Sequence, residues 1–250
     1  AFFETPRQIN ENQNQNKNEI IKKNEQSEIT PNILPEKIIT EISRKDALTK
    51  VDRIIVENEK VTGSISLQGA IFDDLSFKNY KTTLDSEENV IFLNPKETQD
   101  GYYIESGWTS VGNKIAVPNL DTIWKVKGNR VLSNNSDVTL EWDNGRGLTF
   151  TKTISLDEKY LFKIKQKVKN NTSSEVSLYP YAQITRNKKP DDVMGFYILH
   201  EGFIGVFDGE LKEDDYDDVK DKKIVRNSDN GWLGITDKYW VTAIVPPEDQ

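Results

Sequence analysis

The sequence VTLEWDNGRGLTFTKTISL, residues 138–156, decides the fold. Apolar residues follow a period of two on both sides of a short polar segment. They are Val138, Leu140 and Trp142 before the segment and Leu148, Phe150, Ile154 and Leu156 after it. A period of two is typical of β-strands with one buried face. The segment between them, Asp-Asn-Gly-Arg-Gly at 143–147, holds residues that tolerate the positive φ angles of a tight turn. The stretch therefore predicts a β-hairpin.

The same alternation continues on both sides of this hairpin. The next strand is expected at Tyr160, Phe162, Ile164 and Val168, and another begins at Val176 after an Asn-Asn-Thr-Ser turn. Upstream, strands begin at Ile54 and Val56, and a longer apolar pattern over 61–77 breaks at Gly69. No segment keeps a helical period over ~12 residues. The pattern predicts an all-β protein, an antiparallel β-sandwich built from a meander of strands.

The composition excludes several classes of protein. The chain has 250 residues, no cysteine and one histidine, His200. It therefore carries no disulfide framework, no thiolate metal site, no cysteine nucleophile and no pair of histidines. Its 33 Lys and Arg against 41 Asp and Glu give a net charge of −8, whereas a nucleic-acid footprint needs a basic face. We expect no nucleic-acid partner and no cofactor or metal.

Residues 1–49 differ in composition from the rest of the chain. Residues 10–26 read NENQNQNKNEIIKKNEQ, and Pro31 and Pro35 follow. A segment so poor in apolar residues buries too little surface to offset the entropy of ordering it. We predict a flexible Asn/Gln-rich tether over 1–49, with one short helical turn at 36–50, and a single β-sandwich domain over 50–250.

Two groups of residues invite a catalytic or metal-binding interpretation. His200 is followed by Glu201, but neighbours in a strand point to opposite faces, so Glu201 would not orient the imidazole. The acidic segment at 213–218 is rich in oxygen ligands, but the EF-hand spacing fails because its sixth and twelfth positions are Lys220 and Arg226. We therefore predict no catalytic, cofactor-binding or metal-binding residues, and no enzyme activity.

The five tryptophans leave two interpretations open. They are Trp108, Trp124, Trp142, Trp232 and Trp240. Such residues line the cleft of a carbohydrate-binding or sugar-modifying β-sandwich protein, and more often they fill a sandwich core. The carbohydrate-binding interpretation is the alternative function that we carry forward.

Three stretches resemble one known family. Residues 144–154, running on to Tyr160, resemble the "glycine, threonine, phenylalanine, x, lysine" hairpin in the periplasmic domain of the YidC family of bacterial membrane protein insertases. Residues 231–246 are similar to the family's Gly-Trp strand with its aromatic pair and Ala-x-x-Pro ending. Residues 63–71, GSISLQGAI, look like its early strand.

The resemblance implies both a fold and a function. The family's periplasmic domain is a β-supersandwich akin to galactose mutarotases, whose chemistry uses two histidines that this chain lacks. Its members aid the insertion, folding and assembly of inner-membrane proteins, alone or with the Sec translocase. The resemblance thus implies a non-catalytic docking module that faces the periplasm. Its implied partners are accessory subunits of the Sec translocase and nascent membrane proteins, and its implied membrane contact is through helices outside this chain.

The resemblance also bears on both ends of the sequence. Residues 1–3, Ala-Phe-Phe, are expected to be the last of a first membrane helix. Trp232, Tyr239, Trp240, Val241, Ala243 and Val245 form an apolar run, which favours a pair of central strands covered on both faces. Since family members continue with more strands beyond this point, we expect the domain to be incomplete at its C-terminus.

Overall fold

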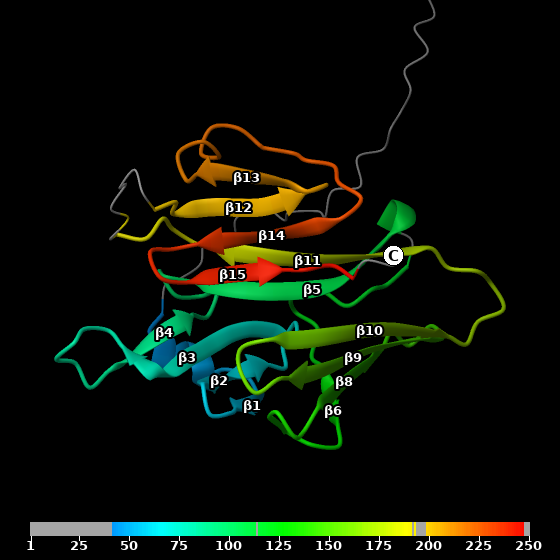
Figure 1. Ribbon diagram of the computed structural model, residues 1–250. Coiled ribbons are helices and arrows are strands. Elements are labelled where there is room, and N and C mark those ends of the chain that lie inside the picture. Colours follow the sequence, from blue (N-terminus) through cyan, green and yellow to red (C-terminus); the bar gives the residue numbers. More distant parts are fainter. Residues whose placement is uncertain (1–41, 114, 192, 194–198, 248–250) are drawn as a thin grey trace, which may run out of the picture. The chain divides into compact units, whose positions relative to one another are not determined.

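A computed structural model describes residues 42–113, 115–191, 193 and 199–247, all of them within one unit of the chain, residues 34–250. Most of the predicted tether, residues 1–41, lies outside the described residues. The residues that the model describes form one short α-helix, one 3-10 turn and fifteen β-strands (Figure 1). The elements are α1 (Arg44–Thr49), β1 (Arg53–Glu57), β2 (Val61–Ser66), β3 (Ile71–Lys81), β4 (Asn89–Leu93), β5 (Tyr102–Ser110), η1 (Val111–Asn113), β6 (Lys125–Lys127), β7 (Val131–Leu132), β8 (Val138–Asp143), β9 (Leu148–Leu156), β10 (Phe162–Asn170), β11 (Leu178–Arg186), β12 (Gly202–Phe207), β13 (Glu210–Asp215), β14 (Gly231–Thr236) and β15 (Val241–Ile244).

The strands form three sheets. A seven-stranded sheet has the order β11-β5-β3-β2-β1-β7, with β4 paired to β3, and two four-stranded sheets have the orders β10-β9-β8-β6 and β13-β12-β14-β15. Every pair is antiparallel except β1 with β7, where Ile55 aligns with Val131. The prediction of an all-β, antiparallel sandwich is confirmed.

The predicted hairpin is present at β8 and β9. Asn144 closes its turn, because the side-chain oxygen accepts hydrogen bonds from the amides of Arg146 and Leu148 at 2.8 and 3.0 Å. Gly145 and Gly147 adopt positive φ angles of 67° and 92°, which a glycine allows without strain. The turn residues therefore have the role that the sequence indicates.

The meander ends after β10, earlier than predicted. β9 pairs with β10 over nine residues, from Leu156 opposite Phe162 to Leu148 opposite Asn170. The next strand, β11, leaves this sheet and pairs with β5 of the seven-stranded sheet, with Pro180 opposite Trp108. A turn of polar residues fixes no pairing partner, so the pattern of alternation could not show that the chain changes sheets here.

The core lies between the four-stranded sheet of β9 and the seven-stranded sheet. Trp108 of β5 packs against Phe150 of β9 with ring centroids 5.1 Å apart, and Phe72 of β3 packs edge-on against Phe162 of β10 at 5.5 Å. Along β9 every second side chain is buried, and Phe150 and Ile154 are completely inaccessible to solvent. The burial of this one strand therefore ties the two sheets together.

The third sheet joins the seven-stranded sheet through its last two strands. Trp240, in the turn between β14 and β15, stacks on Phe77 of β3 at 4.4 Å, and Ile235 of β14 belongs to the main core cluster. β14 has a neighbour on each side, as predicted, but β15 is an end strand and its Val241 is 54% exposed. Apolar composition alone does not distinguish an inner strand from an end strand.

The helical turn expected within residues 36–50 is present at the end of that range as α1, and it is attached to the domain. Ser43 caps it by accepting a hydrogen bond from the amide of Asp46, a common way to begin a helix. Arg44 then forms an ion pair with Asp74 of β3 and donates to the carbonyl of Leu93 at 3.1 Å. The folded part therefore includes residues before the predicted boundary at 50.

We expect Phe150→Ala to lower the free energy of unfolding by about 3–5 kcal/mol, because it removes a fully buried ring from the contact between the two sheets. Thr151→Ala, next to it on the outer face of β9, should change the stability by less than about 0.5 kcal/mol. Urea unfolding followed by tryptophan fluorescence measures both. Similar losses in the two variants would contradict the assigned inner face of β9.

Candidate functional site

His200 has a different carboxylate neighbour from the one considered in the sequence. Its Nδ1 lies 3.5 Å from Asp215 Oδ1, at the end of β13, and its Nε2 lies 2.9 Å from the carbonyl oxygen of Phe203. Glu201, the next residue in the chain, is buried. Both imidazole nitrogens therefore face atoms of the third sheet, a structural arrangement that fixes the ring at the start of β12.

The acidic segment at 213–218 lies at the end of β13 and in the turn that follows. Asp214 forms a two-point ion pair with Arg226, with N–O distances of 2.6 and 2.8 Å, and Arg226 holds the pKa of Asp214 below its usual range. Asp217 pairs with Lys189, and Asp218 accepts from the amide of Asp215. Within the described ranges no three acidic or histidine side chains converge as metal ligands.

The tryptophans belong mainly to the core. Trp108 and Trp124 are buried and stack on each other with ring centroids 6.4 Å apart. Trp142 packs against Phe150, and Trp240 packs against Phe77. Trp232 is half-buried on β14. Four of the five rings are thus occupied by protein contacts, which removes the row of free rings on which the sugar-cleft interpretation depends.

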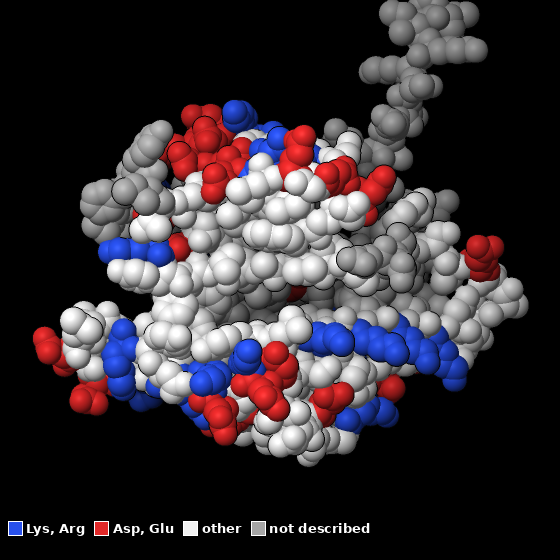
Figure 2. Space-filling model, viewed as in Figure 1, with Lys and Arg blue, Asp and Glu red and all other residues white. Residues whose placement is uncertain are grey.

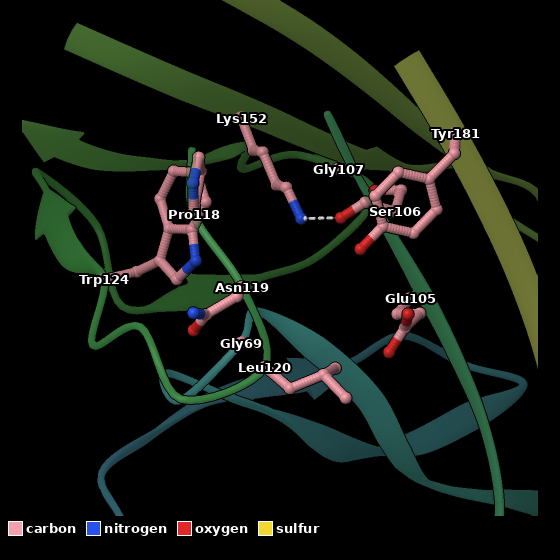
Figure 3. Close-up of a pocket in the computed structure, with 10 residues that line it drawn as sticks. All are labelled: Gly69, Glu105, Ser106, Gly107, Pro118, Asn119, Leu120, Trp124, Lys152 and Tyr181. Carbon is pink, nitrogen blue, oxygen red and sulfur yellow. Dashed lines mark hydrogen bonds between the residues drawn. The ribbon is translucent and has the colours of Figure 1, made fainter. Parts of the chain in front are cut away.

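A small polar pocket lies between β9 of its four-stranded sheet and β5 and β11 of the seven-stranded sheet (Figure 3). Its polar lining comes from Glu105 and Ser106 of β5, Lys152 of β9, Tyr181 of β11 and Trp124. Lys152 is on the inner face of β9 and only 2% exposed. Its ammonium donates a hydrogen bond of 2.5 Å to the Ser106 carbonyl and lies 5.1 Å from the centre of the Trp124 ring. Figure 3 shows the lysine reaching between these two groups.

Burial dominates the electrostatics of this pocket. Desolvation lowers the pKa of Lys152 to about 8, and the nearby Glu105 carboxylate opposes this shift. Desolvation also raises the pKa of Glu105, against the influence of Lys152. The pKa of Tyr181 rises to about 12, first through burial and then through the charge of Glu105 and the hydrogen bond to it. A buried charge is costly unless it is paired. The attraction between Lys152 and Glu105 therefore offsets part of the cost of burying each of them.

The pocket is too small for an organic substrate. Its free volume is ≈ 10 Å³, which is room for about one water molecule. Pockets for small ligands usually have roughly 300–1,000 Å³. The Trp124 indole N–H is buried and has no hydrogen-bond partner within the described part of the chain. We call this cluster of Lys152, Ser106, Glu105 and Tyr181 a polar joint, because its hydrogen bonds connect the four-stranded sheet of β9 to the seven-stranded sheet.

Sequence reasoning missed Lys152 as a buried residue. The alternation from Leu148 to Leu156 places position 152 on the inner face, and a lysine there is the one signal that could have shown it. Its partners Ser106 and Glu105 lie on β5, more than forty residues earlier. They could not be assigned without the pairing of the sheets.

A second polar cluster joins the third sheet to the seven-stranded sheet. Arg186, at the end of β11, contacts both carboxylate oxygens of Asp237 at 2.6 and 2.7 Å and lies over the Tyr102 ring at 4.5 Å. The Tyr102 hydroxyl donates to Thr242 of β15 at 2.7 Å. Burial acts to lower the pKa of Arg186, but Asp237 outweighs it and the pKa lies above its usual value. The cluster fixes the β14–β15 turn against β5 and β11.

The three mainly antiparallel sheets and their polar joints define an all-β sandwich domain. The family model of the YidC periplasmic domain matches residues 53–250, so the chain belongs to this family. Within the described residues no helix is long and apolar enough to cross a membrane.

Curated relatives agree with this assignment. The chain is 46% identical over 224 residues to a protein named membrane protein insertase YidC from Pelagibacter ubique (strain HTCC1062), covering 90% of this chain and 40% of the relative. It is 44% identical over 212 residues to a protein of the same name from Sinorhizobium medicae (strain WSM419), covering 83% and 35%. A third, from Jannaschia sp. (strain CCS1), is 41% identical over 216 residues, covering 82% and 34%. The chain thus spans well under half the length of these relatives.

We expect the contribution of Lys152 to stability to rise with pH. Because its pKa is about 8 in the fold and about 10.4 in an unfolded chain, the unfolded state binds more protons between these values. Linkage then increases the free energy of unfolding through this window, by about 3 kcal/mol at most, and leaves it flat below about pH 8. The difference between the native chain and Lys152→Met, measured by urea unfolding from pH 7 to 10.5, should show this rise.

Tyr102, Tyr181 and Tyr216 also titrate at high pH, but they are present in both proteins. Their contributions to the pH dependence therefore cancel in the difference between the native chain and Lys152→Met. A difference between the two proteins that stays constant from pH 7 to 10.5 would mean that Lys152 titrates normally in the fold.

Arg186→Met should lower the free energy of unfolding by about 2 kcal/mol, because it leaves the half-buried Asp237 without its partner. Arg130→Met is the matched control, since Arg130 pairs with an exposed Asp52 at 3.6 Å and such pairs contribute little. Thermal melts of Arg186→Met, Asp237→Asn and the double variant Arg186→Met/Asp237→Asn give the coupling energy of the pair. A coupling energy near zero would show that the pair does not attach the third sheet.

Proposed function

We propose that this chain is a non-catalytic docking and scaffold domain of a membrane protein insertase, on the periplasmic side of the bacterial inner membrane. The family match over residues 53–250 carries the proposal. The relatives named membrane protein insertase are two to three times as long as this chain, which covers 34–40% of them. Insertion, folding and assembly of inner-membrane proteins are then activities of the whole protein, and this domain supplies surfaces for binding.

The partners proposed for these surfaces are nascent membrane proteins and accessory subunits of the Sec translocase. The domain would contact the membrane through helices outside the 250 residues of this chain. Residues 1–49 would act as a tether, with α1 at their end attached to the sandwich by Arg44. A tether of this composition lets a domain sample positions above a membrane at little entropic cost.

The polar groups of the described structure support a role without turnover. The buried charges of the two polar joints are satisfied by protein atoms, since Lys152 donates to Ser106 and Arg186 pairs with Asp237. The pocket at Lys152 has a free volume of ≈ 10 Å³, which excludes a sugar ring from this pocket. An active site would need reactive groups that face a space large enough for substrate.

Exchange of domains tests the proposal. In the insertase of Pelagibacter ubique, replacing the matching segment by residues 53–250 of this chain should preserve insertion of a test membrane protein and copurification of Sec accessory subunits. An unrelated β-sandwich of the same length, inserted at the same place, should preserve neither to the same extent. Equal performance of the two chimeras would mean that the domain is a spacer and not a docking module.

The same purified chain provides the test for catalysis. We expect no acceleration of aldose mutarotation above that of buffer. Turnover that disappears in His200→Ala or Lys152→Ala would contradict the non-catalytic role, even if the domain exchange succeeds.

A further inference from the structure

Strand β10 combines two faces of opposite chemistry. Its sequence, FKIKQKVKN, places Lys163, Lys165, Lys167 and Lys169 on one face, and all four are exposed. The other face carries Phe162, Ile164 and Val168, which are half-buried and pack against the core cluster. Figure 2 shows Lys and Arg side chains gathered in a row over β10. Alternate residues in a strand are roughly 7 Å apart, so the backbone positions of the four lysines are evenly spaced along the strand.

The positive charge of this row is not neutralised by its surroundings. None of the four lysines forms an ion pair with a described residue. The neighbouring strand β9 places Ser155, Thr153, Thr151 and Thr149 directly opposite them. These hydroxyl side chains are neutral, so the adjacent strand supplies no carboxylate to the row. The carboxylates nearest along the sheet are Glu141 and Asp143 of β8, one strand further away, and Glu141 already pairs with Lys127 at 3.2 Å. The chain as a whole has a net charge of −8, so this row is a local patch of positive charge on an acidic protein.

One edge of β10 is unpaired in the described structure. β9 occupies the other edge over nine residues, and β10 stands at the end of the order β10-β9-β8-β6. An end strand presents a row of backbone N–H and C=O groups that can accept a further strand. The half-buried Phe162, Ile164 and Val168 leave apolar surface that such a strand would cover.

We propose that the free edge of β10 is a docking site for an extended peptide segment in which apolar and acidic residues alternate. Backbone hydrogen bonds would hold the segment, its apolar residues would continue the inner face, and its carboxylates would lie beside the lysines. The proposal deepens the docking role proposed above and rests on it, because it specifies the partner's chemistry at one site.

The row of lysines also rejects other strands. A second copy of β10, paired so that apolar residues stay inside, would place lysines opposite lysines, and like charges on facing positions are destabilising. A strand with lysines or with neutral polar residues on its outer face would gain no cross-strand ion pairs. The row therefore selects for acidic partners and keeps this edge from self-association, both through the same charges.

A binding experiment tests the site with the 250-residue chain. The probe is a fluorescent nine-residue peptide that alternates valine and glutamate, followed by anisotropy at pH 7. A peptide of the same composition with its valines and glutamates in two blocks should bind at least tenfold more weakly, because it cannot place carboxylates on one face. The alternating peptide with every second backbone nitrogen methylated, so that one edge cannot donate, should lose binding to a similar extent.

Charge reversal locates the site. Lys165→Glu/Lys167→Glu should weaken binding of the glutamate peptide at least tenfold and should create binding of a valine–lysine peptide. Lys220→Glu/Lys223→Glu is the matched control, because it makes the same charge change at two exposed lysines outside β10, between β13 and β14. Hydrogen exchange of the native chain should show new protection of β10 amides on addition of the glutamate peptide. Equal melting temperatures of the two double variants show that folding is not the cause.

Three results would overturn the proposal. Equal binding of the methylated or block peptide would mean that the charges act without strand addition. Binding of phosphatidylglycerol vesicles that depends on Lys165 and Lys167, without peptide binding, would assign the row to a lipid surface. If the native chain binds no peptide and Lys165→Glu/Lys167→Glu self-associates, the lysines serve only to prevent pairing between copies of the chain at this edge. The docking role of the domain would survive each of these results if the domain exchange succeeds.

Discussion

The fold depends on the burial of one face of β9 between two sheets. Five of its nine side chains, at every second position from Leu148 to Leu156, are buried, and they contact β5, β8 and β10. A shift of one residue in register would exchange this row for threonines and a serine and would expose the apolar side chains. The register of the whole four-stranded sheet is therefore fixed by a single strand, and the Asn144 turn sets where that strand begins.

The third sheet is attached on a different physical basis. The core around β9 is apolar with one buried lysine, whereas the third sheet is attached by Ile235 and Trp240 together with the Arg186–Asp237 pair and the Tyr102–Thr242 hydrogen bond. Polar contacts have strict geometry, so they specify one orientation where apolar contact alone tolerates several. These contacts therefore fix the orientation of the third sheet relative to β5 and β11.

Most of the local structure could be predicted from the sequence, but the pairing between distant strands could not. The alternation at Val138–Leu156, the Asn-Gly turn and the break at Gly69, where Gly69 and Ala70 both have positive φ, are local signals. The departure of β11 to pair with β5 depends on residues some seventy positions apart, and no local signal encodes it. The polar joint at Lys152 could not be predicted for the same reason. A lysine on the inner face of a strand indicates a buried charge, but it does not indicate which distant residues will pair with it.

The end strands of the two four-stranded sheets prevent or permit association by different means. β10 carries a row of exposed lysines, a common device against edge-to-edge pairing. β15 carries Val241 at 54% exposure, followed by Val245 at 68%, and no charge lies within its four residues. An apolar end strand accepts partners by burial of surface with little selectivity, whereas a lysine-bearing end strand discriminates by charge. The two edges of the described structure therefore differ in the chemistry of the strands that they could accept.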